Sequence, residues 1–326
     1  MLRKISVSLA GVLVLALAAC GGSSSGGAGG SSSAAGNKPL VLGFSQVGSE
    51  SGWRSANTES IKSAAKDAAV DLKFSDAQQK QENQIKALRS FIQQKVSVIS
   101  FSPVVTTGWD TVLKEAKDAK IPVILTDRSV DSDPSLYVTL VGSDFTQEGV
   151  KAGNWVNKEF ADAATVNIAE LQGTTGSAPA IERKKGFFSV VTDKKFNLIA
   201  SQTGDFTRAG GKQVMTAFLK AHPDINLLFA HNDDMALGAI EAIEAAGKVP
   251  GKDIKIISID AVHDGMQALS DGKINYIVEC SPLLGPQLMD TAKKVLAGQS
   301  VEKWIKTNES EFDSTQAKTA LPTRKY

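Results

Sequence analysis

The chain has 326 residues, of which 42% are hydrophobic and 22% are charged, so it can bury a sizeable core and its length favours two. Its 36 basic and 35 acidic residues nearly cancel, which argues against nucleic acid as a partner. Three scattered histidines and two cysteines lack the clustered spacing of a Cys/His metal site, so neither a metal nor a cofactor is expected.

The N-terminus predicts export. Arg3 and Lys4 precede an apolar run, "ISVSLAGVLVLALAA", that is too short and too rich in small residues for a membrane span but is typical of a secretory signal. The end of this run, Leu17-Ala18-Ala19-Cys20, resembles a bacterial lipobox. The resemblance implies a signal peptide over 1–19 and a mature chain held to a membrane by acyl chains on Cys20, outside the cytoplasm. The alternatives are an uncleaved signal anchor and a free cysteine.

Residues 20–38 continue the anchor with a Gly/Ser-rich stretch that has no core of its own and predicts a flexible tether. Glycine after the cysteine and the long tether favour the outer face of a single-membrane cell, with a periplasmic location as the alternative. Because Cys20 is expected to be acylated, Cys280 is left without a partner and no structural disulfide is expected.

From residue 39 onward, short apolar runs alternate with amphipathic stretches of helical length. Strands are predicted over 40–45, 70–76, 96–103, 121–127, 137–144, 165–173, 196–202, 225–233, 254–260 and 274–279. Helices are predicted near 53–69, 80–94, 107–119, 145–160, 180–191, 208–221 and 234–246, with a further short helix after 260. Continuous apolar strands between helices indicate parallel strands covered on both faces. Their number predicts an α/β fold of two doubly wound lobes.

Polar residues follow most of these strands, at the edge where open α/β sheets bind ligands. We expect three of them to cap helices: Asp76, Asp144 and Asp233. Four others are harder to explain as caps, and they offer acceptors, a planar donor fork and an amide: Asp127, Arg128, Asn232 and Asp260. A salt bridge between Asp127 and Arg128 would stabilise little. We expect this pair to face a cleft, and a purely structural salt bridge is the alternative.

These side chains match the chemistry of a neutral polyol. A carboxylate accepts hydroxyl protons, a guanidinium donates to hydroxyl oxygens, and an amide does both. A sugar also has an apolar face that an aromatic ring can cover. The candidate ring is Trp53, beside Arg54 in the loop "QVGSESGWRSA". The alternative for Trp53 is an ordinary core tryptophan.

Several segments give the sequence a family resemblance. The chain resembles the galactofuranose-binding proteins of bacterial ABC importers, in the ribose/galactose group of periplasmic-binding proteins of type I. The resemblance covers nearly the whole chain after the tether. The segments that carry it are "FSQVGSESGWR" (44–54), "QQKQENQIKALRSFIQQ" (78–94), "SPVVTTGWDTVLKEAKDAKIPVILTDRS" (102–129), "ELQGT" and "IERKKGF" within 170–187, "SQTGDFTRAGGKQVM" (201–215) and "AHNDDMALGAI" (230–240).

The resemblance implies two lobes joined by several crossings. The N-terminal lobe would take 39–142 and 281–308, and the C-terminal lobe would take 143–280 and 309–326. A monosaccharide, galactofuranose or a related sugar, would bind between the lobes and pass to an ABC permease with its cytoplasmic ATPase. The protein would be a monomer and not an enzyme.

The resemblance also implies a role for individual residues. Trp53 and Arg54 would cover and hydrogen-bond the sugar. Asp127 and Arg128 would contact it from one lobe, and Arg183, Asn232 and Asp260 from the other. The further candidates are Glu50, Asp205 and Phe206. Two positions depart from the family pattern: Ala261 replaces a glycine, and Glu279-Cys280 stands where the ribose branch has glutamine, with either residue able to face the cleft.

Three rival functions remain open at this point. A secreted glycoside hydrolase could use Asp127 and Asp260 as its carboxylate pair, although Arg128 would keep Asp127 ionised. From residue 39 onward the sequence contains none of the motifs GxSxG, GxxxxGK[ST] and HExxH. A sugar-responsive repressor would carry a helix-turn-helix where this chain has its tether. A binding protein that docks on a chemoreceptor or a histidine kinase is the third rival.

Overall fold

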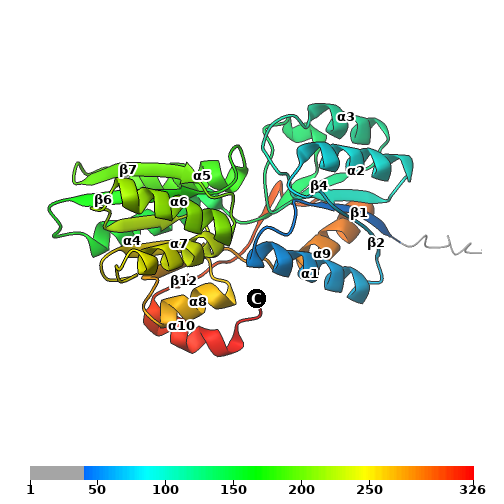
Figure 1. Ribbon diagram of the computed structural model, residues 1–326. Helices are drawn as coiled ribbons and strands as arrows, with labels where there is room; N and C mark the ends of the chain where they lie inside the picture. Colours follow the sequence, from blue (N-terminus) through cyan, green and yellow to red (C-terminus); the bar gives the residue numbers. More distant parts are fainter. Residues whose placement is uncertain (1–39) are drawn as a thin grey trace, which may run out of the picture. The chain divides into compact units, whose positions relative to one another are not determined.

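The computed structural model describes residues 40–326, so the predicted signal peptide, Cys20 and the tether lie outside the described residues. Two six-stranded sheets organise the chain (Figure 1). The predicted α/β fold with two doubly wound lobes is confirmed, and the predicted strands and helices are present with bounds shifted by a few residues. No helix among these residues combines the length and the apolar character that crossing a bilayer requires.

The first lobe surrounds a parallel sheet in the order β11-β5-β4-β3-β1-β2. Its strands are β1 (Val41–Gln46), β2 (Asp71–Asp76), β3 (Val98–Phe101), β4 (Val123–Thr126), β5 (Thr139–Gly142) and β11 (Trp304–Lys306). Its helices are α1 (Gly52–Asp67), α2 (Gln81–Gln93), α3 (Asp110–Asp118) and α9 (Gly285–Leu296), with a 3-10 turn at Pro134–Leu136.

The second lobe surrounds a sheet in the order β12-β10-β9-β8-β6-β7, in which the edge strand β12 is antiparallel to β10. Its strands are β6 (Val166–Gln172), β7 (Phe196–Thr203), β8 (Leu227–Ala230), β9 (Lys255–Asp260), β10 (Tyr276–Glu279) and β12 (Glu311–Phe312). Its helices are α4 (Phe145–Glu159), α5 (Ala178–Val190), α6 (Arg208–Ala221), α7 (Asp233–Ala245), α8 (His263–Ser270) and α10 (Ser314–Ala320), followed by a 3-10 turn at Leu321–Thr323.

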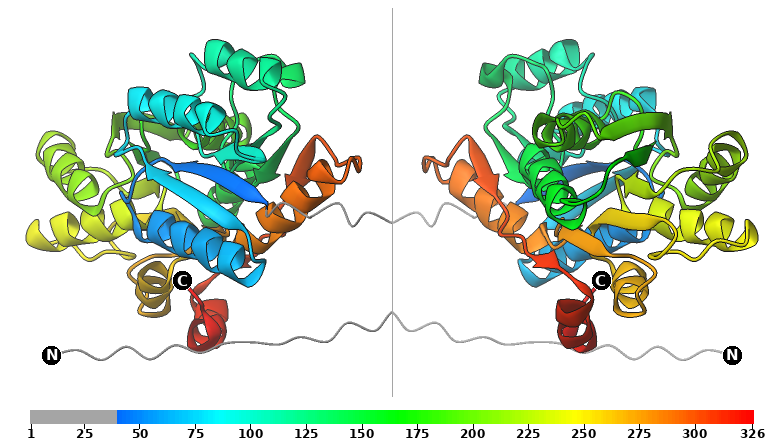
Figure 2. Two further views of the ribbon diagram at one scale, coloured as in Figure 1. Left: turned by 90° about the vertical axis from the view of Figure 1, so that its right-hand side faces the viewer. Right: turned by 90° about the vertical axis from the view of Figure 1, so that its left-hand side faces the viewer.

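Helices cover both faces of each sheet, as the two side views show (Figure 2). The central strands β3, β4, β5 and β8 are buried at every residue, which explains why they read as continuous apolar runs. On α2, Leu88 and Phe91 are buried. Complete burial of one such side chain stabilises the fold by about 1.5–3 kcal/mol.

The chain crosses between the lobes at 143–144, 280–284 and 307–310. The Ser143 hydroxyl joins these crossings, because its Oγ lies 3.4 Å from Cys280 Sγ and 3.2 Å from Thr307 Oγ1, and it also donates to the Glu309 carboxylate. Hydrogen bonds among side chains therefore tie the three crossings together beside the cleft.

The predicted caps have different outcomes. Asp144 caps α4, as expected, by accepting from Gln147 N at 3.1 Å. The prediction for Asp76 is wrong, because this side chain accepts from Gln78 N within a turn and the N-cap of α2 is Lys80. The prediction for Asp233 is also wrong. Asp233 is the first residue of α7 and accepts from Ser258 Oγ and Val262 N, which anchors the end of β9.

Candidate functional site

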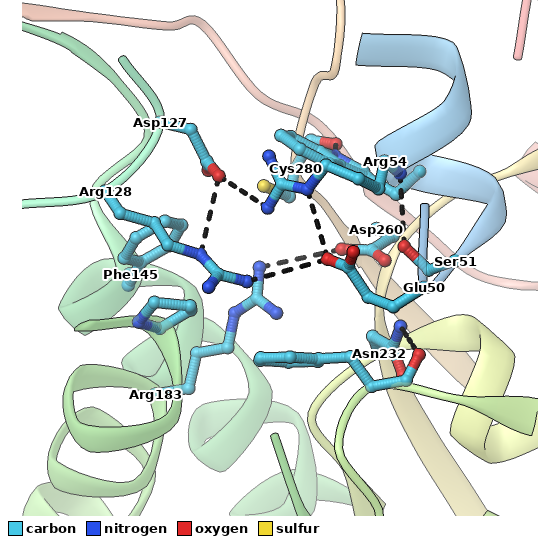
Figure 3. A pocket seen from close by; sticks show the side chains of 13 residues that line it. Glu50, Ser51, Arg54, Asp127, Arg128, Phe145, Arg183, Asn232, Asp260 and Cys280 are labelled. Atoms are coloured by element: carbon cyan, nitrogen blue, oxygen red, sulfur yellow. Dashed lines mark hydrogen bonds and ion pairs between the residues drawn. The ribbon is translucent and has the colours of Figure 1, made fainter. Parts of the chain in front are cut away.

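A pocket of about 280 Å³ of empty space lies where the carboxyl ends of the two sheets face each other (Figure 3). Both lobes and one crossing line it, through Glu50, Ser51, Trp53, Arg54, Asp127, Arg128, Phe145, Pro179, Arg183, Phe206, Asn232, Asp260 and Cys280.

The first lobe supplies a connected set of charges. Arg54 is central to it: its Nη2 lies 2.8 Å from Asp127 Oδ2, and its Nε donates to Glu50 Oε1 at 3.1 Å. Arg128 lies farther away, with its Nε 3.6 Å from Asp127 Oδ2 and its Nη2 4.0 Å from Glu50 Oε1. Asp127 therefore pairs more closely with Arg54 than with its neighbour Arg128, which faces the pocket.

The second lobe has its own charged set, built around Arg183 on α5. Its Nε donates to Glu148 Oε2 at 2.8 Å, its Nη1 donates to the His231 carbonyl at 2.5 Å, and its Nη2 lies 3.6 Å from Asp260 Oδ1. Burial raises the pKa of Asp260 well above its usual range, although the charge of Arg183 opposes this. The Arg183 guanidinium is thus fixed in position at the pocket wall, because its Nε and Nη1 are already hydrogen-bonded to Glu148 and to the His231 carbonyl.

Aromatic rings lie beside the guanidinium groups. The Arg54 Cζ is 4.6 Å from the centre of the Trp53 ring, Arg128 is 5.4 Å from Phe206, and Arg183 is 5.1 Å from Phe145. Stacking of this kind restricts the rotation of each arginine. The pocket wall consequently alternates flat apolar surface with fixed donors.

Several polar atoms in the pocket have no hydrogen-bond partner among the described residues. Glu50 Oε2 and Arg128 Nε are buried without one, and Asp127 Oδ2 has only ion-pair contacts. Burial tends to raise the pKa of Glu50, but the charges of Arg54 and Arg128 outweigh it and hold that pKa below its usual value. Burial, with the neighbouring charge of Arg54, lowers the pKa of Arg128 to about 10. At neutral pH the pocket therefore offers a charged acceptor, Glu50, and a charged donor, Arg128.

Two of the acids are placed by unusual backbone. Asp127, after β4, has a φ of 68°, and Asp260, at the end of β9, has a φ of 124° followed by Ala261 at 62°. Residues other than glycine adopt such angles at a cost of about 1–3 kcal/mol each, and functional sites are places where such strained residues cluster. The alanine that replaces the family glycine is thus in a conformation that glycine adopts freely.

The structure brings most of the predicted residues together. Of the ten, Glu50, Trp53, Arg54, Asp127, Arg128, Arg183, Phe206, Asn232 and Asp260 line the pocket. Asp205 is not among the lining residues, because its side chain is exposed and bonds to Thr203 Oγ1 at 2.9 Å. Asn232 lines the pocket, but its amide also caps α7 through Met235 N and donates to the Phe206 carbonyl.

Sequence reasoning missed Ser51, Phe145 and Pro179, which carry no strand-end signal. It left Glu279 and Cys280 undecided, and the structure places Cys280 at the pocket. Glu279 points elsewhere, toward Tyr326 and Arg324. The alternation of side chains along β10 separates the two residues, but it does not say which face is the cleft.

One group beside the pocket has the spacing of metal ligands. Atoms of Glu148, Cys280 and Glu309 lie within 4.8 Å of one another. Glu148 already pairs with Arg183, and Glu309 accepts hydrogen bonds from Ser143 and other donors of the crossings. Protein contacts therefore account for most of this group, which we interpret as part of the crossing region.

The chain is similar to known proteins over most of its length. A family model described as periplasmic binding protein domain matches residues 42–300. The galactofuranose-binding protein YtfQ of Escherichia coli (strain K12) is 49% identical over 88% of this chain and 92% of its own.

Two solved structures extend the comparison. A Mycobacterium smegmatis protein in complex with beta-D-fucofuranose is 63% identical and covers 88% of this chain and 95% of its own, with a TM-score of 0.86. The binding protein of the arabinose ABC transporter from Shewanella sp. ANA-3, bound to alpha- and beta-L-arabinofuranose, is 49% identical and covers 87% and 95%, with a TM-score of 0.84. On these matches and the two-lobed fold, the chain belongs to the periplasmic binding protein domain family.

Proposed function

We propose that this protein is the sugar-binding component of an ABC importer and that it holds a monosaccharide in furanose form, galactofuranose or a related sugar, in the pocket between its lobes. One observation carries the proposal. Buried carboxylate and guanidinium atoms without hydrogen-bond partners belong to residues that line a small cavity, and the aromatic rings of Trp53, Phe145 and Phe206 form part of its wall. Hydroxyl groups on a compact ring are the partners that such atoms lack.

The relatives support the choice of ring. The similar proteins from Mycobacterium smegmatis and Shewanella sp. ANA-3 are described with bound furanoses. In this chain the arginines that line the pocket, Arg54, Arg128 and Arg183, already pair with acids of their own lobe. A neutral sugar suits such a pocket better than an anionic one, which would leave a carboxylate poorly paired.

Binding would work by closure of the two lobes. Arg128 stands on the first lobe and Arg183 on the second, so one small ring contacts both only when the lobes are close together. The sugar would thereby favour the closed state, which would dock on the permease and release its cargo there. No step in this cycle needs a catalytic group, and we propose that the protein is not an enzyme.

We further propose that the protein acts outside the cytoplasm as a monomer, anchored by acyl chains on Cys20, with residues 39–142 and 281–308 in one lobe and 143–280 and 309–326 in the other. Labelled palmitate fed to the host should enter the wild-type protein and be absent from Cys20→Ala. Equal labelling of the two proteins would refute the proposed acyl anchor on Cys20. Size-exclusion chromatography with light scattering should give the mass of one chain.

Calorimetry tests the central proposal. Titration with D-galactose, D-fucose and L-arabinose, which supply furanose rings by tautomerisation, should give a Kd in the micromolar range or tighter, about −8 kcal/mol or better. Glucuronate and sugar phosphates serve as anionic controls and should not compete. Folded protein that binds none of the neutral sugars would refute the proposal, and turnover of a furanoside would revive the hydrolase alternative.

A further inference from the structure

A contact outside the pocket joins the two lobes at the start of two helices. The main-chain N–H of Gly52, the first residue of α1, donates to Asp234 Oδ2 at 2.8 Å, and Asp234 lies in the first turn of α7. Neither residue lines the pocket, but Gly52 stands between Ser51 and Trp53, which do. The contact therefore holds the pocket end of α1 against the opposite lobe.

The chemistry of this contact favours a carboxylate. The first N–H groups of a helix have no partner within the helix and form the positive end of its dipole. In α1, Ser51 Oγ satisfies the N–H of Arg54, and Asp234 from the other lobe satisfies that of Gly52. The Asp234 side chain is 13% exposed, so water screens its charge only in part. Asp234 thus acts as a second cap of α1, supplied across the cleft.

Opening of the lobes must break this contact. Gly52 belongs to the first lobe and Asp234 to the second, so a separation of the lobes that admits a sugar also separates the N–H from the carboxylate. The backbone hydrogen bond from Thr106 N to Gly176 O, at 2.9 Å, also spans the lobes. The Asp234 contact differs from it in having a charged acceptor, which strengthens a hydrogen bond.

We propose that Asp234 is an affinity-determining positioning residue, which slows sugar release by holding the N-terminus of α1 in the closed state without touching the sugar. The inference rests on the proposed sugar-binding function. A contact made only in the closed state raises the population of that state and with it the apparent affinity. Its loss should appear mainly in the dissociation rate, because the groups that meet the sugar are unchanged.

The chain offers a matched control in Asp264. It occupies the same position of its own helix, the second residue of α8, and it pairs with the same Arg208, at 3.0 Å between Nη2 and Oδ2. Asp264 is exposed, and no hydrogen bond or ion pair joins its side chain to the described residues of the first lobe. Asp234→Ala should raise the dissociation rate and Kd about 5-fold, with little change in the association rate. Asp264→Ala should behave as wild type. Stopped-flow tryptophan fluorescence with D-fucose or L-arabinose measures both rates.

A second variant removes the other partner. Gly52→Pro deletes the donor N–H, and proline is favoured at the first position of a helix. Ser51 before it has extended backbone, with φ −144° and ψ 163°, which suits a residue preceding proline. Gly52→Ala retains the N–H, and its Cβ would meet Asp234 Oδ2 at an ordinary 3.5 Å. The proline variant should match Asp234→Ala, the alanine variant should match wild type, and Gly52→Pro/Asp234→Ala should be no weaker than either single variant.

The outcomes separate the two proposals. If wild type binds sugar and both Asp234→Ala and Gly52→Pro release it at the wild-type rate, the proposed role of Asp234 is refuted and the sugar-binding function stands. If wild type binds none of the sugars, the proposed sugar-binding function is refuted, and the proposed role of Asp234 is refuted with it. Circular dichroism without sugar checks folding, and if Asp234→Ala fails to fold, Gly52→Pro decides.

Discussion

The indole N–H of Trp53 donates to the main-chain carbonyl of Cys280, with 2.7 Å between Nε1 and O. Trp53 projects from α1 of the first lobe, whereas Cys280 lies in a crossing and packs with apolar residues of the second lobe. The Trp53 ring joins that same apolar group and also forms part of the pocket wall. The sequence left two alternatives for Trp53, packing in the core and lining the pocket. In the structure Trp53 does both.

Trp53→Phe separates the ring from the hydrogen bond. Phenylalanine preserves an aromatic surface but leaves the Cys280 carbonyl unpaired, which costs about 1–3 kcal/mol for a buried group. We expect sugar to bind roughly 10-fold more weakly if this carbonyl orders the closed state. Trp155→Phe is the control, because Trp155 stacks on Tyr276 and does not line the pocket. Calorimetry on both variants checks the prediction, and equal affinities would assign Trp53 to packing alone.

Arg128→Met tests the donor at the pocket wall. Methionine fills similar space without charge, and it leaves Asp127 and Glu50 with less positive charge nearby. Truncating one partner of a buried charged contact with a ligand costs about 2–5 kcal/mol, so Kd should rise by about two orders of magnitude or more. Arg89→Met removes an exposed arginine that pairs with Glu115 and should bind as wild type. Full affinity in Arg128→Met would show that the site is misplaced.

Gly173→Ala should weaken binding through Phe206. A Cβ at Gly173 would lie 1.8 Å from Phe206 Cζ, so the ring must move away from the pocket wall. We expect about a 10-fold loss of affinity, since an overpacked contact of this kind costs about 1–3 kcal/mol. In the background of Phe206→Ala the same glycine substitution should have little further effect. A further loss of equal size in the double variant would argue that Gly173 acts independently of the ring.

The buried network around Glu170 predicts an acid-sensitive fold. Burial alone would raise the pKa of Glu170, but hydrogen bonds from His231, Lys184 and Ser201 outweigh it and lower that pKa to about 2. A folded pKa below the unfolded value stabilises the protein above pH 4.5, and this stabilisation is lost as the pH falls toward 2. The contribution at neutral pH is about 3 kcal/mol.

Urea unfolding at pH 7 and pH 3 measures this effect. Wild type should be more stable than Glu170→Gln at pH 7, and the difference should shrink at pH 3, because Glu170 is protonated there in the unfolded chain but not yet in the folded protein. A difference that does not change with pH would mean that the carboxylate stabilises the fold through its shape and hydrogen bonds rather than its charge.

Much of the fold could be predicted because the central parallel strands β3, β4, β5 and β8 are buried on both faces and read as unbroken apolar runs. The C-terminal part of the chain shows the limit of this approach. Strands β11 and β12 have three and two residues, too few for a pattern. Helix α9 does carry an amphipathic pattern, with Leu288, Met289 and Ala292 buried, and it could have been predicted from the residues alone.

The site was predictable where a polar residue follows an apolar strand, as with Asp127 and Asp260. A polar residue at a strand end does not by itself indicate ligand binding, because such a residue can instead cap the helix that follows. Asn232 caps α7 while it lines the pocket, and Asp233, next to it, anchors the end of β9. Residue type alone cannot separate such roles, because capping and ligand binding use the same acceptor oxygens.

By itself, the sequence determines that this chain forms two α/β lobes with polar strand ends, because the burial of each segment leaves a periodic trace in its own residues. Tertiary structure alone decided that Cys280 rather than Glu279 faces the pocket and that Phe145 forms part of its wall. It also decided that Asp234 of one lobe caps the helix of the other. These relationships join residues far apart in the chain, so they depend on how the lobes and their crossings pack, which no local pattern records.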